Sequence, residues 1–184
     1  IGLFFKKRFG WYEILVSLFF IVTMLTGGKT NQLAALGIYL CWEILLLLFY
    51  KYYRKSKDGK WVFYLVSFLS LLPIIFVKVQ PAINGTQSLL GFLGISYLTF
   101  RSLGIIIELR DGVIKDFTFW EFLRFLLFMP TFSSGPIDRF KRFNENYQTV
   151  PERDELMDML EEAVKYIMLG FLYKFIIAHI LGET

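Results

Sequence analysis

The chain has 184 residues, of which 55% are hydrophobic and 19% aromatic, and its mean hydropathy is +0.52. These values exceed those of a typical soluble domain and predict a membrane protein. The net charge of +4 would suit a nucleic-acid-binding protein, but the basic residues cluster at the ends of apolar runs, which excludes that class of partner. One cysteine and one histidine exclude an internal disulfide, a cysteine metal centre and a paired-histidine metal centre.

Apolar runs follow one another along the chain. Residues 1–5 indicate the tail of an earlier transmembrane helix, so we interpret the chain as a fragment. Residues 11–26, 32–53, 61–77 and 89–109 are predicted to form four spans, since ~20 apolar residues cross ~30 Å of hydrocarbon. A last helix is predicted to begin near Pro151, with an amphipathic first half, and to enter the bilayer over residues 163–181.

Basic residues give the orientation. The predicted loop 51–60 contains five of them against one acidic residue, and residues 6–8 are all basic. Basic loops stay in the cytoplasm, which places the turn at 27–31 and the predicted loop 78–86 outside. We therefore predict a multi-pass protein of the cell membrane, with its cytoplasmic and outer loops assigned as above.

The fourth predicted span carries an unusual polar stripe. At about 100° per residue, Tyr97, Arg101, Gly104 and Glu108 fall on one face of the helix. Charged groups at membrane depth cost about 2.5 to 3.5 kcal/mol each, so this face should meet protein or water. The stripe is either the polar wall of a substrate tunnel or a pair of charges that neutralise each other or a neighbouring helix.

A short aromatic helix is predicted at residues 118–129, too short to span and suited to an interfacial or re-entrant position. A helix-breaking stretch follows, because Pro130 and Pro136 lack backbone N–H groups and Gly135 permits unusual dihedrals. Non-helical backbone at membrane depth must line a cavity or be buried in protein, whereas outside the membrane it is an ordinary loop. Residues 138–154 are predicted to be an aqueous loop.

Two strings in these segments resemble a known family. They are residues 94–101 (GISYLTFR) and the pattern of Phe-Met-Pro, four residues, and Gly-Pro-Ile-Asp-Arg over residues 128–139. Both resemble the first half of membrane-bound O-acyltransferases, and within that family the members that D-alanylate teichoic acids. The resemblance implies an all-α, polytopic transmembrane protein with a ring of helices that includes short interfacial and broken ones.

The same resemblance implies an activity. Such enzymes take D-alanine from the phosphopantetheine arm of a cytoplasmic acyl carrier protein, with no other cofactor, and pass it to lipoteichoic acid outside through a tunnel among membrane-embedded helices. Residues 1–184 would be the N-terminal transmembrane portion of the larger domain. The tunnel candidates implied are Tyr97, Arg101, Glu108, Ser133, Ser134, Gly135, Pro136 and Arg139.

No catalytic residue is assigned within these 184 residues. His179 is interpreted as a packing or interfacial residue, because the resemblance places the catalytic histidine in a later segment after a Trp-His block. Two alternatives stay open. One is a transporter or channel subunit with a broken-helix substrate site, and the other is a structural membrane subunit.

Overall fold

The computed structural model describes residues 9–26, 31–56, 59–84, 92–133 and 138–182. All regular elements in these ranges are helices, which confirms the predicted all-α fold. They form two compact units, one spanning Phe9–Gln148 and one containing Thr149–Thr184. The elements are α2 (Gly10–Thr26), α3 (Asn31–Ser56), α4 (Lys60–Asn84), α5 (Ile95–Arg110), α6 (Phe119–Leu126), the 3₁₀ helix η1 (Met129–Thr131), α7 (Phe140–Gln148), α8 (Arg153–Phe171), the π-helical η2 (Leu172–Ile177) and α9 (Ala178–Gly182).

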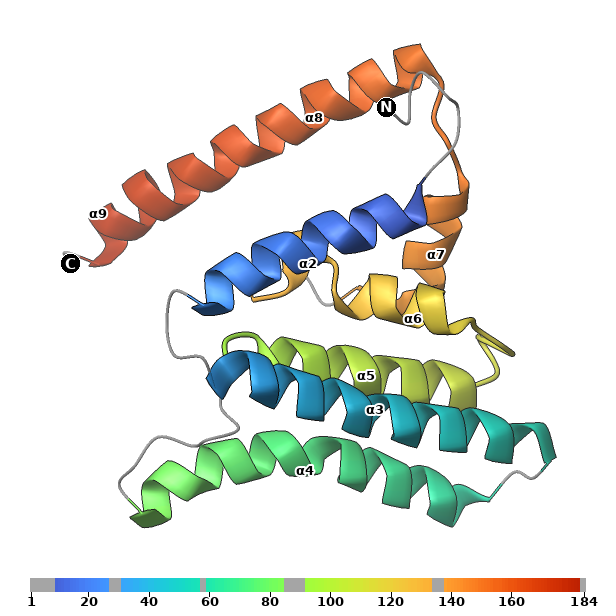
Figure 1. The fold of residues 1–184 in the computed structure, drawn as a ribbon. Coiled ribbons are helices and arrows are strands. Elements are labelled where there is room, and N and C mark those ends of the chain that lie inside the picture. The colour runs from blue at the N-terminus through green and yellow to red at the C-terminus, as the bar shows by residue number, and fades with distance from the viewer. Residues whose placement is uncertain (1–8, 27–30, 57–58, 85–91, 134–137, 183–184) are drawn as a thin grey trace. The chain divides into compact units, whose positions relative to one another are not determined.

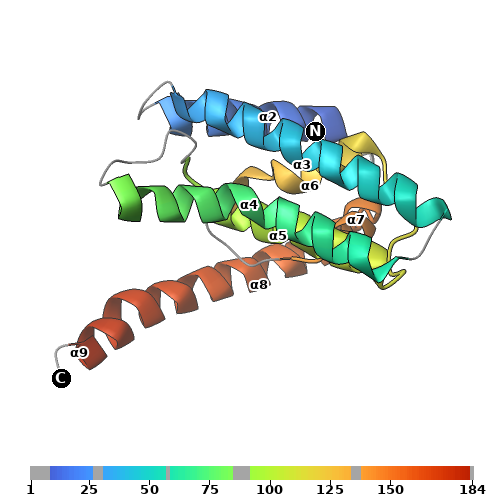
Figure 2. The ribbon, with the colours of Figure 1, turned by 90° about the horizontal axis from the view of Figure 1, so that it is seen from below.

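The helices α3, α4 and α5 lie side by side in the first unit, with α3 and α4 antiparallel (Figures 1 and 2). Buried residues recur along α3 every three or four positions, at Ala35, Tyr39, Glu43, Leu47 and Tyr50. This spacing keeps them on one face of the helix, which packs against α4 and α5. The helix α2 packs against α3, α6 and η1.

Three helical segments among the described residues are long and apolar enough to cross a membrane, at Gln32–Lys55, Lys60–Ile83 and Arg153–Gly182. They coincide with the second, third and last predicted apolar helices. The first predicted span corresponds to the shorter apolar helix α2. In the second unit, α8, η2 and α9 follow one another without a break over Arg153–Gly182. The acidic residues Asp154 and Glu155 lie in its first turn, where the helix dipole favours them.

Two predicted loops are largely helical. Residues 51–56 extend α3, since Lys and Arg are good helix formers and favour a helix C-terminus. Residues 78–84 extend α4, whose interior holds both Pro73 and Pro81. Pro73 deprives the Leu69 carbonyl of its helical donor, and the indole Nε1 of Trp42 donates to that carbonyl over 3.0 Å. A neighbouring helix therefore supplies the bond that the proline removes.

The fourth predicted span is also shorter than expected, because α5 begins only at Ile95. The residue before it, Gly94, has a φ of 96°, a left-handed conformation that ends any helix arriving from its N-terminal side. Residues 89–91 lie outside the described part of the chain.

The predicted aqueous loop 138–154 contains the helix α7. Its Phe140 and Phe143 rings lie 5.3 Å, centroid to centroid, from the ring of Phe125 in α6. One aromatic face in an otherwise polar segment is thus enough for a short helix once a partner surface exists.

Candidate functional site

The predicted interruption of the helix after the aromatic segment is confirmed over the described residues, up to Ser133. The helix α6 begins with a capping box, in which the Thr118 side chain accepts from the Glu121 amide and the Glu121 carboxylate accepts from the Thr118 amide. After Leu126 the backbone leaves the α-helical form, and Pro130 lies in the short 3₁₀ helix η1. Residues 134–137, including the candidates Ser134, Gly135 and Pro136, lie outside the described residues.

Arg101 holds this broken segment from α5. Its side chain is only 2% exposed, and it donates to the Leu126 carbonyl at 3.2 Å and to the Thr131 hydroxyl. Its guanidinium carbon also lies 4.8 Å from the centroid of the Phe125 ring. The carbonyl at the end of α6 has no helical donor of its own, so Arg101 satisfies it and links α6 to η1.

Glu108 lies two turns further along α5 and serves a different neighbour. It is 7% exposed, and its Oε2 accepts from the Lys141 amide in the first turn of α7 at 3.1 Å. A carboxylate is favourable there, because unpaired N–H groups of a helix face it. Among the described residues no ion pair joins Arg101 to Glu108, so each charge of the stripe is met by an adjacent segment. The tunnel role of both residues stays a prediction.

The first turn of α5 lies directly against the broken segment. A Cβ atom built on Gly94 would lie 2.7 Å from the Phe132 carbonyl oxygen, closer than such contacts allow. Glycines at 91, 94 and 104 of the fourth predicted span lead us to expect close helix approach there. Gly91 lies outside the described residues, close approach is found at Gly94, and no atom lies within 4 Å of a Cβ on Gly104. Glycine is needed at Gly94 for both its φ and its lack of a side chain.

A pocket of about 480 Å³ opens beside this contact. Two predicted candidates, Tyr97 and Ser133, line it together, although they come from different segments. Gln32, Lys78 and Ser96 also line it, and sequence reasoning did not select them. The pocket therefore combines the start of α3, the end of α4, the start of α5 and the broken segment.

Arg139 has a more open position than the other candidates. Its side chain is exposed, and its backbone amide donates to the Asp138 carboxylate at 2.7 Å. The same carboxylate forms an ion pair with Arg142, whose Nη2 lies 2.5 Å from Oδ1. Arg142 thus has this carboxylate as a partner although its side chain is 65% exposed, whereas no hydrogen bond or ion pair of the Arg139 side chain is found among the described residues.

A buried polar group joins α3, α4 and α5. Glu43 is fully buried and accepts from the Ser70 hydroxyl, whose oxygen lies 3.1 Å and 3.0 Å from its two carboxylate oxygens. One turn away, the Tyr39 hydroxyl donates to Thr99 Oγ1 at 3.2 Å. In the sequence, these residues stand out only as single polar side chains in apolar helices. In the structure, they form hydrogen bonds with one another inside the bundle.

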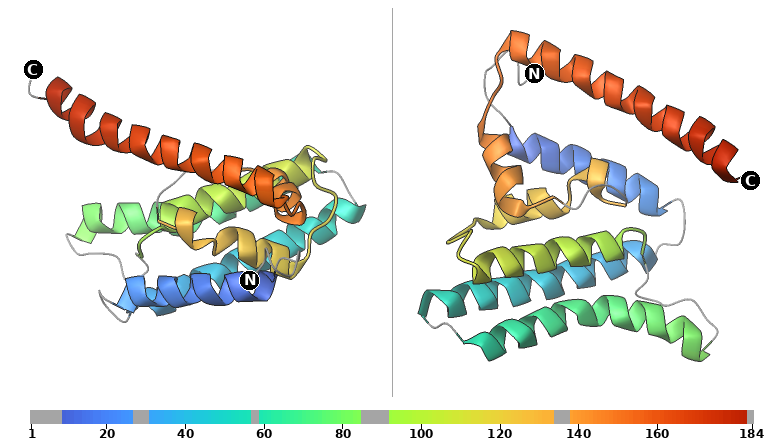
Figure 3. Two further views of the ribbon diagram at one scale, coloured as in Figure 1. Left: turned by 90° about the horizontal axis from the view of Figure 1, so that it is seen from above. Right: turned by 180° about the vertical axis from the view of Figure 1, so that it is seen from behind.

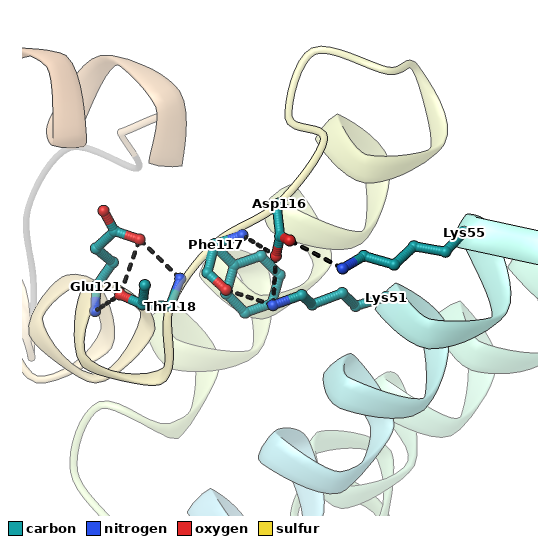
Figure 4. Close-up of polar contacts among 6 residues, drawn as sticks. All are labelled: Lys51, Lys55, Asp116, Phe117, Thr118 and Glu121. Carbon is teal, nitrogen blue, oxygen red and sulfur yellow. Dashed lines mark hydrogen bonds and ion pairs between the residues drawn. The ribbon is translucent and has the colours of Figure 1, made fainter.

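A second polar cluster was missed because its members are far apart in sequence (Figure 4). Lys51 and Lys55, near the end of α3, lie 2.5 Å and 2.9 Å from the carboxylate of Asp116, in the segment between α5 and α6. Lys51 also donates to the Phe117 carbonyl. Hydrogen bonds from Lys51 and then Lys55 hold the pKa of the Asp116 carboxyl well below its usual range.

No group of three His, Cys, Asp or Glu side chains that could hold a metal ion occurs in the part of the chain that the structure describes. His179 lies in α9, in the second unit, and is exposed there.

Comparison with known proteins gives three matches that cover nearly all of this chain. The chain is 69% identical over 183 residues to the teichoic acid D-alanyltransferase of Streptococcus thermophilus, 46% over 185 residues to that of Lacticaseibacillus rhamnosus, and 37% over 180 residues to that of Bacillus subtilis. The matches cover 94–100% of this chain and 44–46% of the relatives, so the chain spans less than half of their length. No family model matches the chain. The resemblance inferred from the two strings is confirmed by these relatives.

Proposed function

We infer that this chain, which is homologous over its whole length to teichoic acid D-alanyltransferases, is the N-terminal transmembrane portion of an O-acyltransferase that places D-alanine on lipoteichoic acid. The observation that carries the proposal is the 69% identity over 183 residues, which includes both strings that prompted the resemblance. It favours acyl transfer over the transporter and structural alternatives.

The donor in this proposal is a D-alanyl thioester on the phosphopantetheine arm of a DltC-like acyl carrier protein. A hydroxyl of the acceptor forms an ester with the D-alanyl carbonyl as the thioester bond breaks, and the proton of the hydroxyl ends on the carrier thiol. Such a transfer needs a base and a donor for the developing oxyanion. We place the catalytic histidine outside these 184 residues and assign His179 no catalytic role.

The residues of this chain then form part of a substrate tunnel. Arg101 and Glu108 act as positioning residues, because each is buried and fixes a segment that follows the aromatic helix. Tyr97 and Ser133 face the pocket and are the residues placed to contact substrate. The apolar helices cross the bacterial cell membrane, with the basic ends of α3 and α4 in the cytoplasm.

The proposal is tested with the intact protein in phospholipid vesicles, with D-alanyl carrier protein on the cytoplasmic side and lipoteichoic acid on the other. We expect ester-linked D-alanine to accumulate on the acceptor. Replacing Arg101 with Leu should lower transfer at least about tenfold, as expected for losing a buried charge-assisted bond. His179→Ala should retain most activity. Absence of transfer by the intact, correctly inserted protein would reject the proposal.

A matched pair examines the end of the broken segment. Arg139→Ala should reduce transfer more than Arg142→Ala, since the Arg142 guanidinium is occupied by Asp138 and that of Arg139 has no such partner among the described residues. Equal activity in both variants would remove Arg139 from the candidate site.

A further inference from the structure

The pocket beside Gly94 lies at one end of the α3–α4–α5 bundle. Gln32 lies in the first turn of α3, Lys78 and Pro81 lie in the last turns of α4, and Tyr97 is in the first turn of α5. The basic residues at the other ends of α3 and α4 lie at the opposite end of the bundle, because the two helices are antiparallel (Figure 3). If those basic residues are cytoplasmic, the pocket faces outside.

The lining of the pocket suits an anion that also carries hydroxyl groups. Lys78 supplies a positive charge, and no ion pair of its ammonium is found among the described residues. None of the described residues that line the pocket is acidic. Gln32, Tyr97 and Ser133 add neutral donors and acceptors of hydrogen bonds.

A further acceptor comes from the backbone of α4. Pro81 has no N–H, so the Val77 carbonyl four residues earlier loses its helical donor, and both residues line the pocket. A carbonyl of this kind can accept a hydrogen bond from a ligand hydroxyl. At about 480 Å³ the pocket has the size of an ordinary small-molecule site.

We propose that this pocket binds a phosphodiester and a neighbouring hydroxyl of a polyol-phosphate chain, with Lys78 on the phosphate. The inference rests on the proposed function, because it makes the pocket the holding site for the anionic acceptor. It also explains why Tyr97 and Ser133 share a cavity with a lysine that has no partner in the described structure.

A second basic pocket, of about 210 Å³, lies at the opposite end and is lined by Arg54, Lys55 and Lys115. Two of its three basic side chains already have partners in the protein. Lys55 pairs with Asp116, and Arg54 donates to the Arg110 carbonyl at 3.0 Å. It therefore has less charge available for a ligand, and Lys115 provides a matched control.

The test measures binding of a short poly(glycerol phosphate) oligomer to the intact protein in nanodiscs of phosphatidylcholine. We expect affinity that weakens with added salt and falls about tenfold in Lys78→Gln, the loss of one charge-assisted hydrogen bond. Lys78→Arg should bind within about twofold of the wild type, and so should Lys115→Gln, because a guanidinium keeps the charge and Lys115 lies at the other end. Equal oligomer affinity in the wild type and Lys78→Gln would overturn the inference.

Two further arms separate the remaining possibilities. Nanodiscs containing phosphatidylglycerol test the lipid as the source of the phosphodiester, and Lys78-dependent retention of that lipid without oligomer binding would overturn the acceptor assignment. In the transfer assay, Lys78→Gln should raise the KM for the acceptor and leave kcat unchanged. Normal transfer with an unchanged KM would refute this inference alone, whereas Lys78-dependent oligomer binding without any transfer would refute the proposed function alone.

Discussion

The two ends of the α3–α4–α5 bundle use lysine in different ways. At the end of α3, Lys51 and Lys55 are tied to Asp116 and so connect α3 to the segment that leads into α6. At the other end, Lys78 lines an open pocket beside the broken segment. At the first end the lysine charges stabilise the fold, and at the second end the lysine charge is available to a ligand. The role of a lysine in this protein therefore depends on whether its charge is paired with another residue.

The largest expected effect comes from comparing a glycine at each end. Gly94 and Gly112 both have positive φ, of 96° and 70°. Alanine at Gly112 should cost about 1–2 kcal/mol of backbone strain only, since no atom lies within 4 Å of its Cβ position. Alanine at Gly94 should cost about 2–5 kcal/mol, because its Cβ would also collide with the Phe132 carbonyl.

Thermal unfolding of both variants in detergent measures this difference. Gly94→Ala should also reduce D-alanyl transfer per inserted molecule, because the collision displaces Phe132 next to Ser133. Similar melting temperatures for the two variants would show that the close approach at Gly94 is not maintained.

A lysine pair sharpens the contrast between the ends. Lys51→Met should destabilise the protein by about 1–2 kcal/mol, because the Phe117 carbonyl and Asp116 both lose a partly buried donor. Lys78→Met should leave stability within about 0.5 kcal/mol, as for an exposed side chain without a structural partner. Denaturation of both variants under identical conditions gives the comparison, and a larger loss in Lys78→Met would reverse our distinction.

The smallest effect concerns acidity at the Lys51–Asp116 cluster. The folded pKa of Asp116 is depressed, so its contribution to stability is present above the unfolded pKa of about 4 and is lost as pH falls toward the folded pKa. Asp116 is 55% exposed, and we expect a contribution below about 1 kcal/mol.

The stability difference between the wild type and Asp116→Asn measures this contribution. It should be constant from pH 7 to 5 and shrink below about pH 4. A difference that grows on acidification would contradict the depressed pKa.

The class of fold and the position of the break follow from local features of the sequence. Runs of about 20 apolar residues specify long helices, because helix formation and apolar burial depend on neighbours a few residues apart. Pro130 predicts the end of the aromatic helix for the same local reason, and the break is present. The two strings were sufficient to recognise the relatives, since they combine glycine and proline positions with specific polar residues.

The pairing of polar groups, in contrast, depends on how the helices pack against one another. The helix α7 depends on the ring of Phe125, and the tolerated Pro73 depends on Trp42 from another helix. Arg101 donates to the carbonyl of Leu126, and Lys51 pairs with Asp116, although each pair is separated by at least 25 positions in the sequence. The pocket with Lys78 combines four separate segments. Such contacts are set by the packing of whole helices, which local propensities do not encode.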